Sequence, residues 1–410
     1  MRTNLREGLL PPADESEARA ILRACVHCGF CNATCPSYQV LGDERDGPRG
    51  RIYLIKSLLE GSAATGTTQV HLDRCLDCRA CETTCPSGVQ YTRLHDLVRP
   101  QIEKLATRGF RARITRWLLR ILVPHPRRFR LLLAVGRFFR PVLPGSLRRM
   151  IPRRFPSPVV SAPLPGPRRY ALLEGCVQEI AAPEINQAAV AVFARLGITL
   201  DRVSGAGCCG ALALHLGAVD DAMNCARRNI DAWWPAIEAG GCEGVVSASS
   251  GCSQALKAYD HLLRADPNYA TRAAAIAHVA RDASELMPAD MDYLCREDPV
   301  SVTLAFQTPC SLQHGLRAAT HVESALVAAG YSLVPSAESH LCCGSAGAYS
   351  LLQPAIAEQL LRRKLECLQA NNPEAIVTAN IGCLLHLRKS ATIPVRHWLG
   401  FVADRMRVDH

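Results

Sequence analysis

The chain has 410 residues, a formal net charge of +10 and twenty cysteines. A chain of this length divides into about two or three domains with cores of their own and needs no disulfide framework. Its start carries Glu7, Asp14, Glu15 and Glu17 instead of a basic and then apolar secretory signal, and no apolar run reaches the roughly 20 residues of a membrane span. We therefore exclude a disulfide-rich secreted domain and expect reduced thiols in the cytoplasm.

Two cysteine motifs stand out in the first predicted domain, residues 1–103. Residues 25–36 read CVHCGFCNATCP and residues 75–86 read CLDCRACETTCP, so both follow C-x2-C-x2-C-x3-C-P. In this pattern the first three cysteines bind one 4Fe-4S cluster and the fourth binds the other cluster of the pair. Structural zinc also accepts four thiolates, but it does not require this repeated spacing. We predict two 4Fe-4S clusters, one on Cys25, Cys28, Cys31 and Cys85, and one on Cys75, Cys78, Cys81 and Cys35.

The stretch GDERDGPRGRIYLIKSLLEG between the motifs predicts a turn and then a helix that starts near Pro48. Arg49 and Arg51 lie at this helix start. Their charge would raise the reduction potential of a neighbouring cluster, because net charge and hydrogen bonds tune such potentials. The alternative is that both arginines are solvated.

The predicted connector, residues 104–169, accounts for the whole net positive charge of the chain. Residues 104–154 contain one lysine, fourteen arginines and no acidic residue, which is +15 and leaves −5 for all other residues. Prolines forbid one long helix, and aromatic residues alternate with arginines, as in short amphipathic helices that lie in a membrane interface. We predict docking on an anionic membrane surface or on a partner subunit. A solvated linker is the alternative, and nucleic acid is not expected as a partner. The residues concerned are Pro124, Pro126, Pro141 and Pro144, with Trp117, Phe129, Phe138 and Phe139.

Residues 170–295 and 296–410 are related by a duplication. Cys176 precedes a Cys-Cys-Gly at 208–210 with 31 residues between, and Cys310 precedes a Cys-Cys-Gly at 342–344 with the same interval. Each copy then ends a β-like run in Gly-Cys, at Cys252 and Cys383. Strand-like and helix-like runs alternate in both copies, which predicts parallel sheets with cysteines at the carboxyl ends of strands. The predicted fold class is α+β: a mainly helical ferredoxin-like domain with two 4Fe-4S motifs, followed by two duplicated α/β units with parallel strands.

The first copy also contains GAGCCG, in which Gly205, Gly207 and Gly210 fit the G-x-G-x-x-G fingerprint of dinucleotide binding. The second copy reads SHLCCG at the same place, with Ser339 and Leu341 instead of the first two glycines. The duplicated feature is therefore the thiol pair with its glycine, and we predict no nucleotide or flavin site on this chain.

Two ferredoxin-type motifs followed by two Cys-Cys-Gly repeats resemble the iron–sulfur subunits of flavin-linked hydroxyacid and glycerol-3-phosphate dehydrogenases and of heterodisulfide reductases. The runs ILRACVHCGFCNATCPSYQVLGDERDGPRGRIYLIK, MNCARRNIDAWWPAIEAG, HLCCGSAG and VTANIGC are most similar to glycolate oxidase iron–sulfur subunits. This resemblance implies electron transfer in a complex that oxidises glycolate to glyoxylate, with D-lactate as a further substrate. It also implies FAD on partner subunits, a respiratory or quinone-linked acceptor, and a peripheral place on the cytoplasmic face of the inner membrane. The alternatives are a glycerol-3-phosphate or lactate dehydrogenase subunit, and a heterodisulfide-reductase-like enzyme with catalytic repeats.

One departure from the wider family concerns the closing C-x2-C of each repeat, whose first position is Ser249 in copy one and Asn380 in copy two. Each copy then keeps four cysteines, enough for a further cluster, and heterodisulfide-type catalysis is disfavoured. These candidate sites are Cys176, Cys208, Cys209 and Cys252 in copy one, and Cys310, Cys342, Cys343 and Cys383 in copy two.

Histidines distinguish the two copies. His314, His340 and His386 lie close to the cysteines of copy two, whereas copy one has only His215 near its Cys-Cys-Gly. We hypothesise that copy two is the more active half, with a histidine that hydrogen-bonds a cluster or relays a proton; ordinary surface histidines are the alternative. The remaining cysteines have no partner spacing and are predicted to be core residues, and two adjacent tryptophans are predicted to pack or to contact a partner. These are Cys225, Cys242, Cys295 and Cys367, with Trp233 and Trp234.

Overall fold

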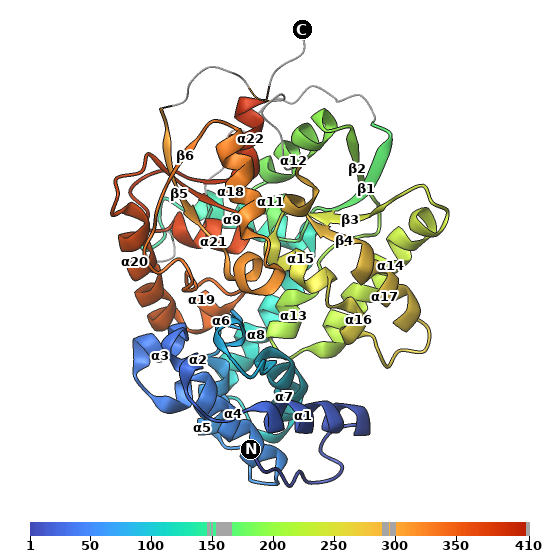
Figure 1. Cartoon of the computed structure of the whole chain (residues 1–410), viewed down its shortest axis with the longest axis vertical. Helices are drawn as coiled ribbons and strands as arrows, with labels where there is room; N and C mark the ends of the chain where they lie inside the picture. Colours follow the sequence, from blue (N-terminus) through green and yellow to red (C-terminus); the bar gives the residue numbers. More distant parts are fainter. Residues whose placement is uncertain (146–147, 149–150, 153–165, 289–294, 296–300, 407–410) are drawn as a thin grey trace.

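A computed structural model describes the chain except for residues 146–147, 149–150, 153–165, 289–294, 296–300 and 407–410. The N-terminal part is helical and lies at one end of the molecule, in blue in Figure 1. Its elements are α1 (Pro12–Ala24), α2 (Phe30–Ala33), α3 (Pro36–Leu41), η1 (Glu44–Asp46), α4 (Pro48–Leu59), α5 (Gly66–Asp73), α6 (Ala80–Thr84) and α7 (Tyr91–Leu105).

Prolines and apolar stripes explain these helices. Pro36 and Pro48 occupy the first turn of α3 and α4, where the missing N–H has no intrahelical partner to lose. Leu22 of α1, Ile55 of α4 and Leu94 of α7 are fully buried in one shared core. The helix predicted to start near Pro48 is confirmed, and its packing fixes the loops that carry the two cysteine motifs.

The connector forms two amphipathic helices, α8 (Phe110–Leu122) and α9 (Pro126–Phe139), with Pro124 and Pro126 at the break between them. Leu133 of α9 packs against Ile180 and Ala181 of α11 (Gln178–Ala181). Among the described residues, no helix is long and apolar enough to span a membrane. Residues 153–165 of the predicted connector, with Arg153 and Arg154, lie outside the described part.

The first repeat contains a parallel four-stranded sheet in the order β2-β1-β3-β4. Central β1 pairs with β2 and β3, and the register places Ala171 beside both Asp201 and Val245. The elements are β1 (Arg168–Leu173), α12 (Glu184–Arg195), β2 (Ile198–Arg202), α13 (Ala211–His215), α14 (Val219–Glu238), β3 (Gly244–Ser247), α15 (Ser250–Leu256), α16 (Tyr259–Leu262), α17 (Ala270–Val279), β4 (Ala280–Asp282) and η2 (Ala283–Leu286).

The second repeat has the same topology, with the parallel order β6-β5-β7-β8. The predicted duplication of α/β units with parallel strands is therefore confirmed. The elements are β5 (Thr303–Gln307), η4 (Ser311–Leu316), α18 (Ala319–Ala328), β6 (Ser332–Val334), α19 (Tyr349–Leu352), α20 (Pro354–Gln369), β7 (Ala375–Thr378), α21 (Ile381–Leu387), β8 (Val395–His397) and α22 (Trp398–Arg405).

The two repeats lie side by side and share a core (Figure 1). Helix α12 of the first packs against α22 of the second, and Val192, Phe193 and Leu399 are fully buried there. At the carboxyl ends of the sheets, the Ser250 N–H donates to the Ala379 carbonyl at 3.2 Å. This contact brings the cysteine-bearing loops of the two repeats together.

Both repeats also rest on the helical N-terminal part. The Tyr349 hydroxyl donates to the Arg74 carbonyl at 3.1 Å, and His314 Nδ1 lies 2.9 Å from Thr83 Oγ1. From the first repeat, His215 Nδ1 lies 3.0 Å from Asp77 Oδ2. The cysteine edges of the sheets therefore face the motif loops.

Candidate metal centres

The first cleft lies between the loop of the first motif and the end of the second. A space of ≈ 430 Å³ is lined by Cys25, Cys28, Cys31 and Cys85, with Cys81 at its inner side. Cys28 is exposed, so the cleft reaches the surface. Burial raises the pKa of Cys31 to about 11, and Cys25 adds to the shift. A free thiol there is protonated at neutral pH, so metal binding must release a proton.

The second cleft, of ≈ 320 Å³, is lined by Cys35, Cys75, Cys78 and Cys81. The two clefts share Cys81 and are therefore adjacent. Cys85 lies with the first motif and Cys35 with the second, which is the crossed grouping that the spacing predicts. A purely sulfur donor set suits an iron–sulfur cluster. Each thiolate of a 4Fe-4S cluster bonds its own iron, so the sulfurs need not converge on one point as they do around a single ion.

The two motif loops have the same backbone conformation. His27 and Gly29 have φ of 62° and 89°, and Asp77 and Arg79 have φ of 51° and 62° at the equivalent positions. Two left-handed residues curl each loop around its cleft. A Cβ at Gly29 would lie 2.4 Å from the guanidinium of Arg49, so a larger residue there would displace this flexible side chain.

Arg51 is buried beside the second cleft, so the alternative of a solvated helix start is wrong for this residue. Its guanidinium lies 3.9 Å from Cys35 Sγ and donates to Ser37 Oγ at 2.9 Å and to the His71 carbonyl at 2.8 Å. Burial disfavours the charge, but its acidic neighbours, Cys75 first among them, together outweigh burial and raise the pKa of Arg51. Arg49 is partly exposed and pairs with Glu44 at 2.6 Å.

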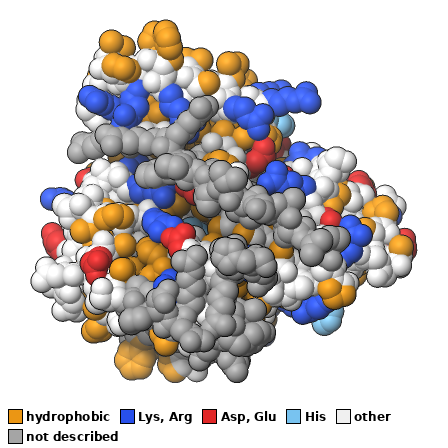
Figure 2. All heavy atoms as spheres, turned by 90° about the horizontal axis from the view of Figure 1, so that it is seen from above, with side chains coloured by type: hydrophobic (Ala, Val, Ile, Leu, Met, Phe, Trp, Pro, Cys, Tyr) orange, Lys and Arg blue, Asp and Glu red, His pale blue; other side chains and the backbone are white. Residues whose placement is uncertain are grey.

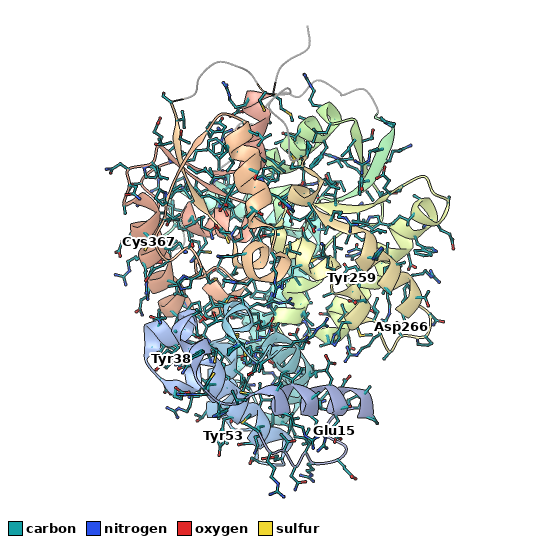
Figure 3. The ribbon with its side chains drawn as sticks, viewed as in Figure 1. Glu15, Tyr38, Tyr53, Tyr259, Asp266 and Cys367 are labelled. Atoms are coloured by element: carbon teal, nitrogen blue, oxygen red, sulfur yellow. The ribbon has the colours of Figure 1, made fainter. Side chains whose placement is uncertain are left out.

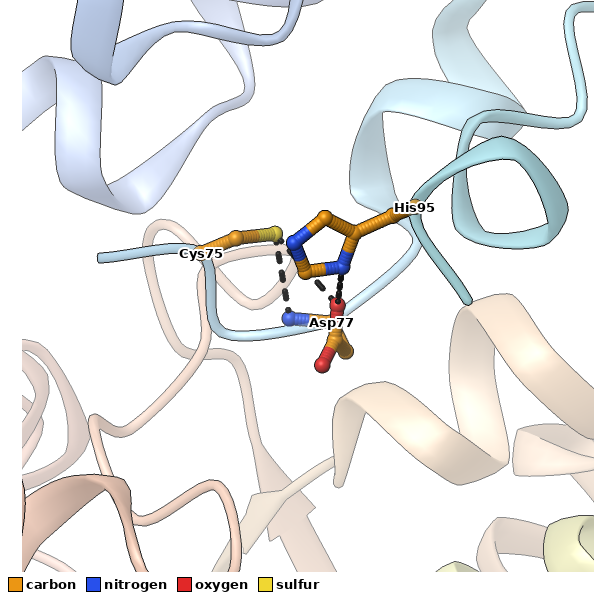
Figure 4. A group of neighbouring side chains, drawn as sticks. All are labelled: Cys75, Asp77 and His95. Atoms are coloured by element: carbon orange, nitrogen blue, oxygen red, sulfur yellow. Dashed lines mark hydrogen bonds and ion pairs between the residues drawn. The ribbon is translucent and has the colours of Figure 1, made fainter. Parts of the chain in front are cut away.

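A charged network surrounds the second motif. The Asp77 N–H donates to Cys75 Sγ at 3.4 Å, and Asp77 Oδ1 lies 2.8 Å from His95 Nδ1 (Figure 4). Arg99 donates to Asp77 Oδ2 at 2.9 Å. Burial alone would raise the pKa of Asp77, but Arg99 and His95 hold it well below its usual range.

Among the described residues, two further groups are close enough to hold a single ion: Cys75 with Asp77 and His95, and Asp43 with Asp46 and His71. In both groups an arginine already binds the carboxylate: Arg99 donates to Asp77, and Arg74 donates to Asp46 at 2.9 Å. A cation would have to compete with these arginines for the carboxylate oxygens. We read both groups as supports of the motif loops.

The cysteines of the first repeat gather where its strands end. Cys176 follows β1, and Cys252 lies in the first turn of α15 after β3. The thiol of Cys208 adjoins Cys176, and that of Cys209 adjoins Cys252. The Cys208 contact and burial raise the pKa of Cys176. At Cys209 the neighbouring Cys208 lowers the pKa, but Cys252 and burial outweigh this effect and the pKa is raised.

The glycine of the first Cys-Cys-Gly is required by packing. Gly210 has φ of 90°, and a Cβ there would lie 3.0 Å from the Ala222 carbonyl of α14. A Cβ at Gly205 would meet only the Ala232 side chain, at an ordinary 3.6 Å. The turn that the repeats share therefore serves the cysteines and their packing against a helix.

The second repeat repeats this arrangement. Cys310 Sγ lies 3.9 Å from Cys342 Sγ, and Cys343 adjoins Cys383. Cys310 and Cys342 also belong to a buried group that contains Leu76 and Cys78 of the second motif. The second repeat's cysteines thus lie next to the second cleft.

Two of the three histidines singled out in copy two hydrogen-bond backbone carbonyls through their side chains. His314 Nε2 lies 3.0 Å from the His340 carbonyl, and His386 Nε2 lies 3.4 Å from the Ala357 carbonyl. Burial, with Lys389, lowers the pKa of His386 to about 4. Among their described hydrogen bonds none reaches a cysteine sulfur, and their role in proton transfer stays a hypothesis.

The two departures from the wider family lie together between the repeats. The Ser249 hydroxyl donates to Asn380 Oδ1 at 2.8 Å, and the Asn380 amide donates to Cys383 Sγ at 3.6 Å. Ser249 and Asn380, which replace the cysteines of the wider family, thus connect the two repeats, and Asn380 hydrogen-bonds the candidate ligand Cys383.

Of the four remaining cysteines, three are buried as predicted and Cys367 is not. Cys225 is buried but adjoins Cys208, so copy one gathers five thiols. Cys367 is partly exposed on the outer side of α20, with its thiol 3.7 Å from Glu338 (Figure 3). Cys242 and Cys295 are buried, as is Trp233, while Trp234 is partly buried. In the sequence, Cys225 has no counterpart in copy two, so the duplication gave no signal for it.

Known families match the parts that carry these cysteines. Residues 21–89 match the 4Fe-4S dicluster domain, and residues 170–257 and 304–388 match the cysteine-rich domain. The chain is 47% identical over 413 residues to the glycolate oxidase iron–sulfur subunit of Escherichia coli (strain K12), covering 99% of each chain. The chain belongs to the family of glycolate oxidase iron–sulfur subunits.

Further relatives extend this family assignment. The probable glycolate oxidase iron–sulfur subunit of Bacillus subtilis (strain 168) is 31% identical over 409 residues, covering 92% of this chain and 89% of its own. Lactate utilization protein A of the same organism is 26% identical over 245 residues, covering 56% of this chain and 96% of its own. Membership in the family makes this chain an iron–sulfur protein and a subunit of an oxidoreductase.

Proposed function

We propose that this chain is the electron-transfer subunit of a flavin-linked complex that oxidises glycolate to glyoxylate. The glycolate oxidase relatives support glycolate as the substrate, and the lactate utilization relative supports lactate, which we propose in its D form, as a further one. FAD on partner subunits would accept the hydride of the substrate, and the electrons would leave toward a respiratory acceptor. The observation that carries the proposal is the pair of adjacent sulfur-lined clefts, next to the cysteines of the second repeat.

The residues would divide into two ligand sets. Each set would hold a 4Fe-4S cluster, which takes up and releases single electrons when bound. The shared lining residue Cys81 keeps the sets close, and buried Tyr91 lines both clefts. The sets are Cys25, Cys28, Cys31 and Cys85, and Cys75, Cys78, Cys81 and Cys35.

We also propose that the cysteines of the repeats bind further clusters, and that electrons from the second motif reach the second repeat first. Cys310, Cys342, Cys343 and Cys383 offer four thiols, and Cys78 of the second motif lies in the same buried group as two of them. Electrons could then pass from the second cleft to the second repeat without crossing solvent.

The partner subunits are proposed to dock where the first cleft opens. Cys28 is exposed there, and the side chains of Val26 and Phe30 beside it are 67% and 62% exposed. Apolar side chains of this size around a redox site are typical of an interface for another protein.

The connector is proposed to bind the cytoplasmic face of the inner membrane. Side chains of α8 and α9 expose a row of large apolar groups, of which Phe110 and Phe138 are 76% and 78% exposed. Figure 2 shows hydrophobic and basic side chains beside one another along the upper edge of the molecule, which is the back of Figure 1, where these helices run. Apolar residues that enter the acyl boundary, with arginines at the headgroups, fit an anionic lipid surface.

The division of the chain at 103/104, 169/170 and 295/296 is part of the proposal. Helix α7 continues to Leu105, and the family matches lie within three of the four predicted parts. The last boundary adjoins residues 296–300, outside the described part.

An assay of the copurified complex tests the function. We expect Cys78→Ser to leave glycolate-dependent reduction of the partner's flavin intact and to reduce glycolate-dependent quinone reduction to background. Cys242→Ser, at a buried thiol that lines neither cleft, serves as the control and should behave as wild type. Wild-type quinone reduction in the Cys78→Ser complex would contradict the proposal.

A further inference from the structure

Helix α14 is fastened to the Cys-Cys-Gly turn of the first repeat. The Asn229 amide donates to the Cys208 carbonyl at 3.0 Å, and its Oδ1 accepts from the Gly207 N–H at 2.8 Å. The Tyr259 hydroxyl donates to the Cys209 carbonyl at 3.0 Å (Figure 3). The backbone that carries both thiols is therefore held from two sides.

Cys225 lies one turn before Asn229, on the same face of α14. It is 9% exposed and packs in one buried group with Cys176 and Cys208. The adjoining Cys208 thiol, together with burial, raises the pKa of Cys225, while Arg228 opposes the shift. Three sulfurs from three separate parts of the repeat thus meet at one place.

The second repeat packs in the same way without this sulfur. A Cβ at Gly210 would lie 3.4 Å from Cys225 Cβ, and a Cβ at Gly344 would lie 3.0 Å from Leu360 Cβ. The Cβ at Gly210 would also lie 3.0 Å from the Ala222 carbonyl oxygen, and the Cβ at Gly344 would lie 2.8 Å from the Ala357 carbonyl oxygen. Leu360 of α20 therefore has the place that Cys225 has on α14.

We infer that Cys225 is a fifth thiol of the first repeat's site and binds its iron–sulfur cluster. The inference rests on the proposal that cysteines of the repeats bind a cluster. Sulfur donors favour iron–sulfur binding. Because a cubane uses four protein thiolates, a site with five binds iron differently from the four-thiol site of the second repeat. The four thiols joined by Cys225 are Cys176, Cys208, Cys209 and Cys252.

The competing explanation is that Cys225 is a small apolar residue that fills the core. If this explanation holds, leucine can replace Cys225 without loss, because Leu360 fills the corresponding position in the second repeat. A substitution of Cys225 by leucine therefore separates the two explanations.

The experiment compares Cys225→Leu and Cys225→Ser with wild type in the complex copurified with its partner subunits. Iron and sulfide per chain are counted, and the clusters are examined by Mössbauer and EPR spectroscopy. We expect both variants to lose iron or to change the spectrum of one cluster, while the ferredoxin-type signals stay as in wild type. Circular dichroism checks that each variant folds. Serine has about the size of cysteine, so Cys225→Ser provides the test if the Cys225→Leu chain does not fold.

Two further variants make each outcome decisive. Cys242→Ser, at a buried thiol that donates to the Gly244 carbonyl at 3.1 Å, should leave iron and spectra unchanged. Cys209→Ser should remove the same cluster. Wild-type iron and spectra in both Cys225 variants, with loss in Cys209→Ser, would overturn this inference alone. No loss in Cys209→Ser would instead overturn the cluster in the first repeat, and the inference with it.

Discussion

Arg51 is the residue that most directly links the protein's charge to a candidate cluster. It is fully buried, and its guanidinium is held by Ser37 and His71 within 3.9 Å of Cys35 Sγ. A cluster bound by thiolates is anionic, so a fixed positive charge beside it favours the reduced state.

Replacement of Arg51 by leucine should lower the reduction potential of the cluster on the second motif. It should also destabilise the chain by about 3–5 kcal/mol, because Asp46 and the cysteines lose a buried partner. An EPR-monitored redox titration measures the potential, and denaturant unfolding measures the stability.

Arg45→Leu is the matched control, because Arg45 is exposed and bonds Asp43 across the surface. Its complex should titrate as wild type does. An Arg51→Leu complex with the wild-type potential would show that this charge does not tune the cluster.

At the scale of elements, the connector separates into an inner and an outer side. Several of its arginines pair with acidic residues of this chain: Arg116 pairs with Asp73 at 3.1 Å and Arg120 with Asp221 at 2.7 Å. The charge of +15 in the sequence therefore overstates what is free to meet a membrane. The exposed aromatic groups are the stronger argument for membrane binding.

The double substitution Phe138→Glu and Phe139→Glu should weaken binding of the complex to anionic vesicles by roughly tenfold or more. Burial of a Phe side chain contributes about 1.5–3 kcal/mol, and 1.4 kcal/mol is a factor of ten in affinity. Cosedimentation with vesicles measures the effect.

Val327→Glu is the control, since Val327 is 58% exposed and belongs to α18 of the second repeat instead of the connector. That complex should sediment as wild type does. Equal vesicle binding by the Phe138/Phe139 variant would assign the apolar face of α9 to another partner.

At the scale of the whole molecule, the fold followed from repetition in the sequence. Two identical cysteine spacings and a 31-residue interval that occurs twice predicted a helical domain with two parallel α/β units, and the structure has these parts. The grouping of Cys35 with Cys75 was predictable because the motif itself encodes it.

The rest depends on contacts that no local pattern encodes. Asp77 meets His215, which lies 138 residues later, and Ser249 meets Asn380 across the two repeats. Cys225 reaches Cys208 only because α14 packs on the Cys-Cys-Gly turn, and helical periodicity alone makes it a core residue. Single residues of this kind are placed by tertiary packing, so their spacing in the sequence carries no signal.

The most direct test of the account is EPR spectroscopy of the anaerobic complex, frozen after glycolate is added in the absence of an acceptor. We predict that glycolate reduces 4Fe-4S clusters on this chain, and that Cys35→Ser and Cys85→Ser each alter the signal of a different cluster. Reduction of the partner's flavin with no reduced iron–sulfur signal would contradict the claim that this chain carries the electrons of glycolate.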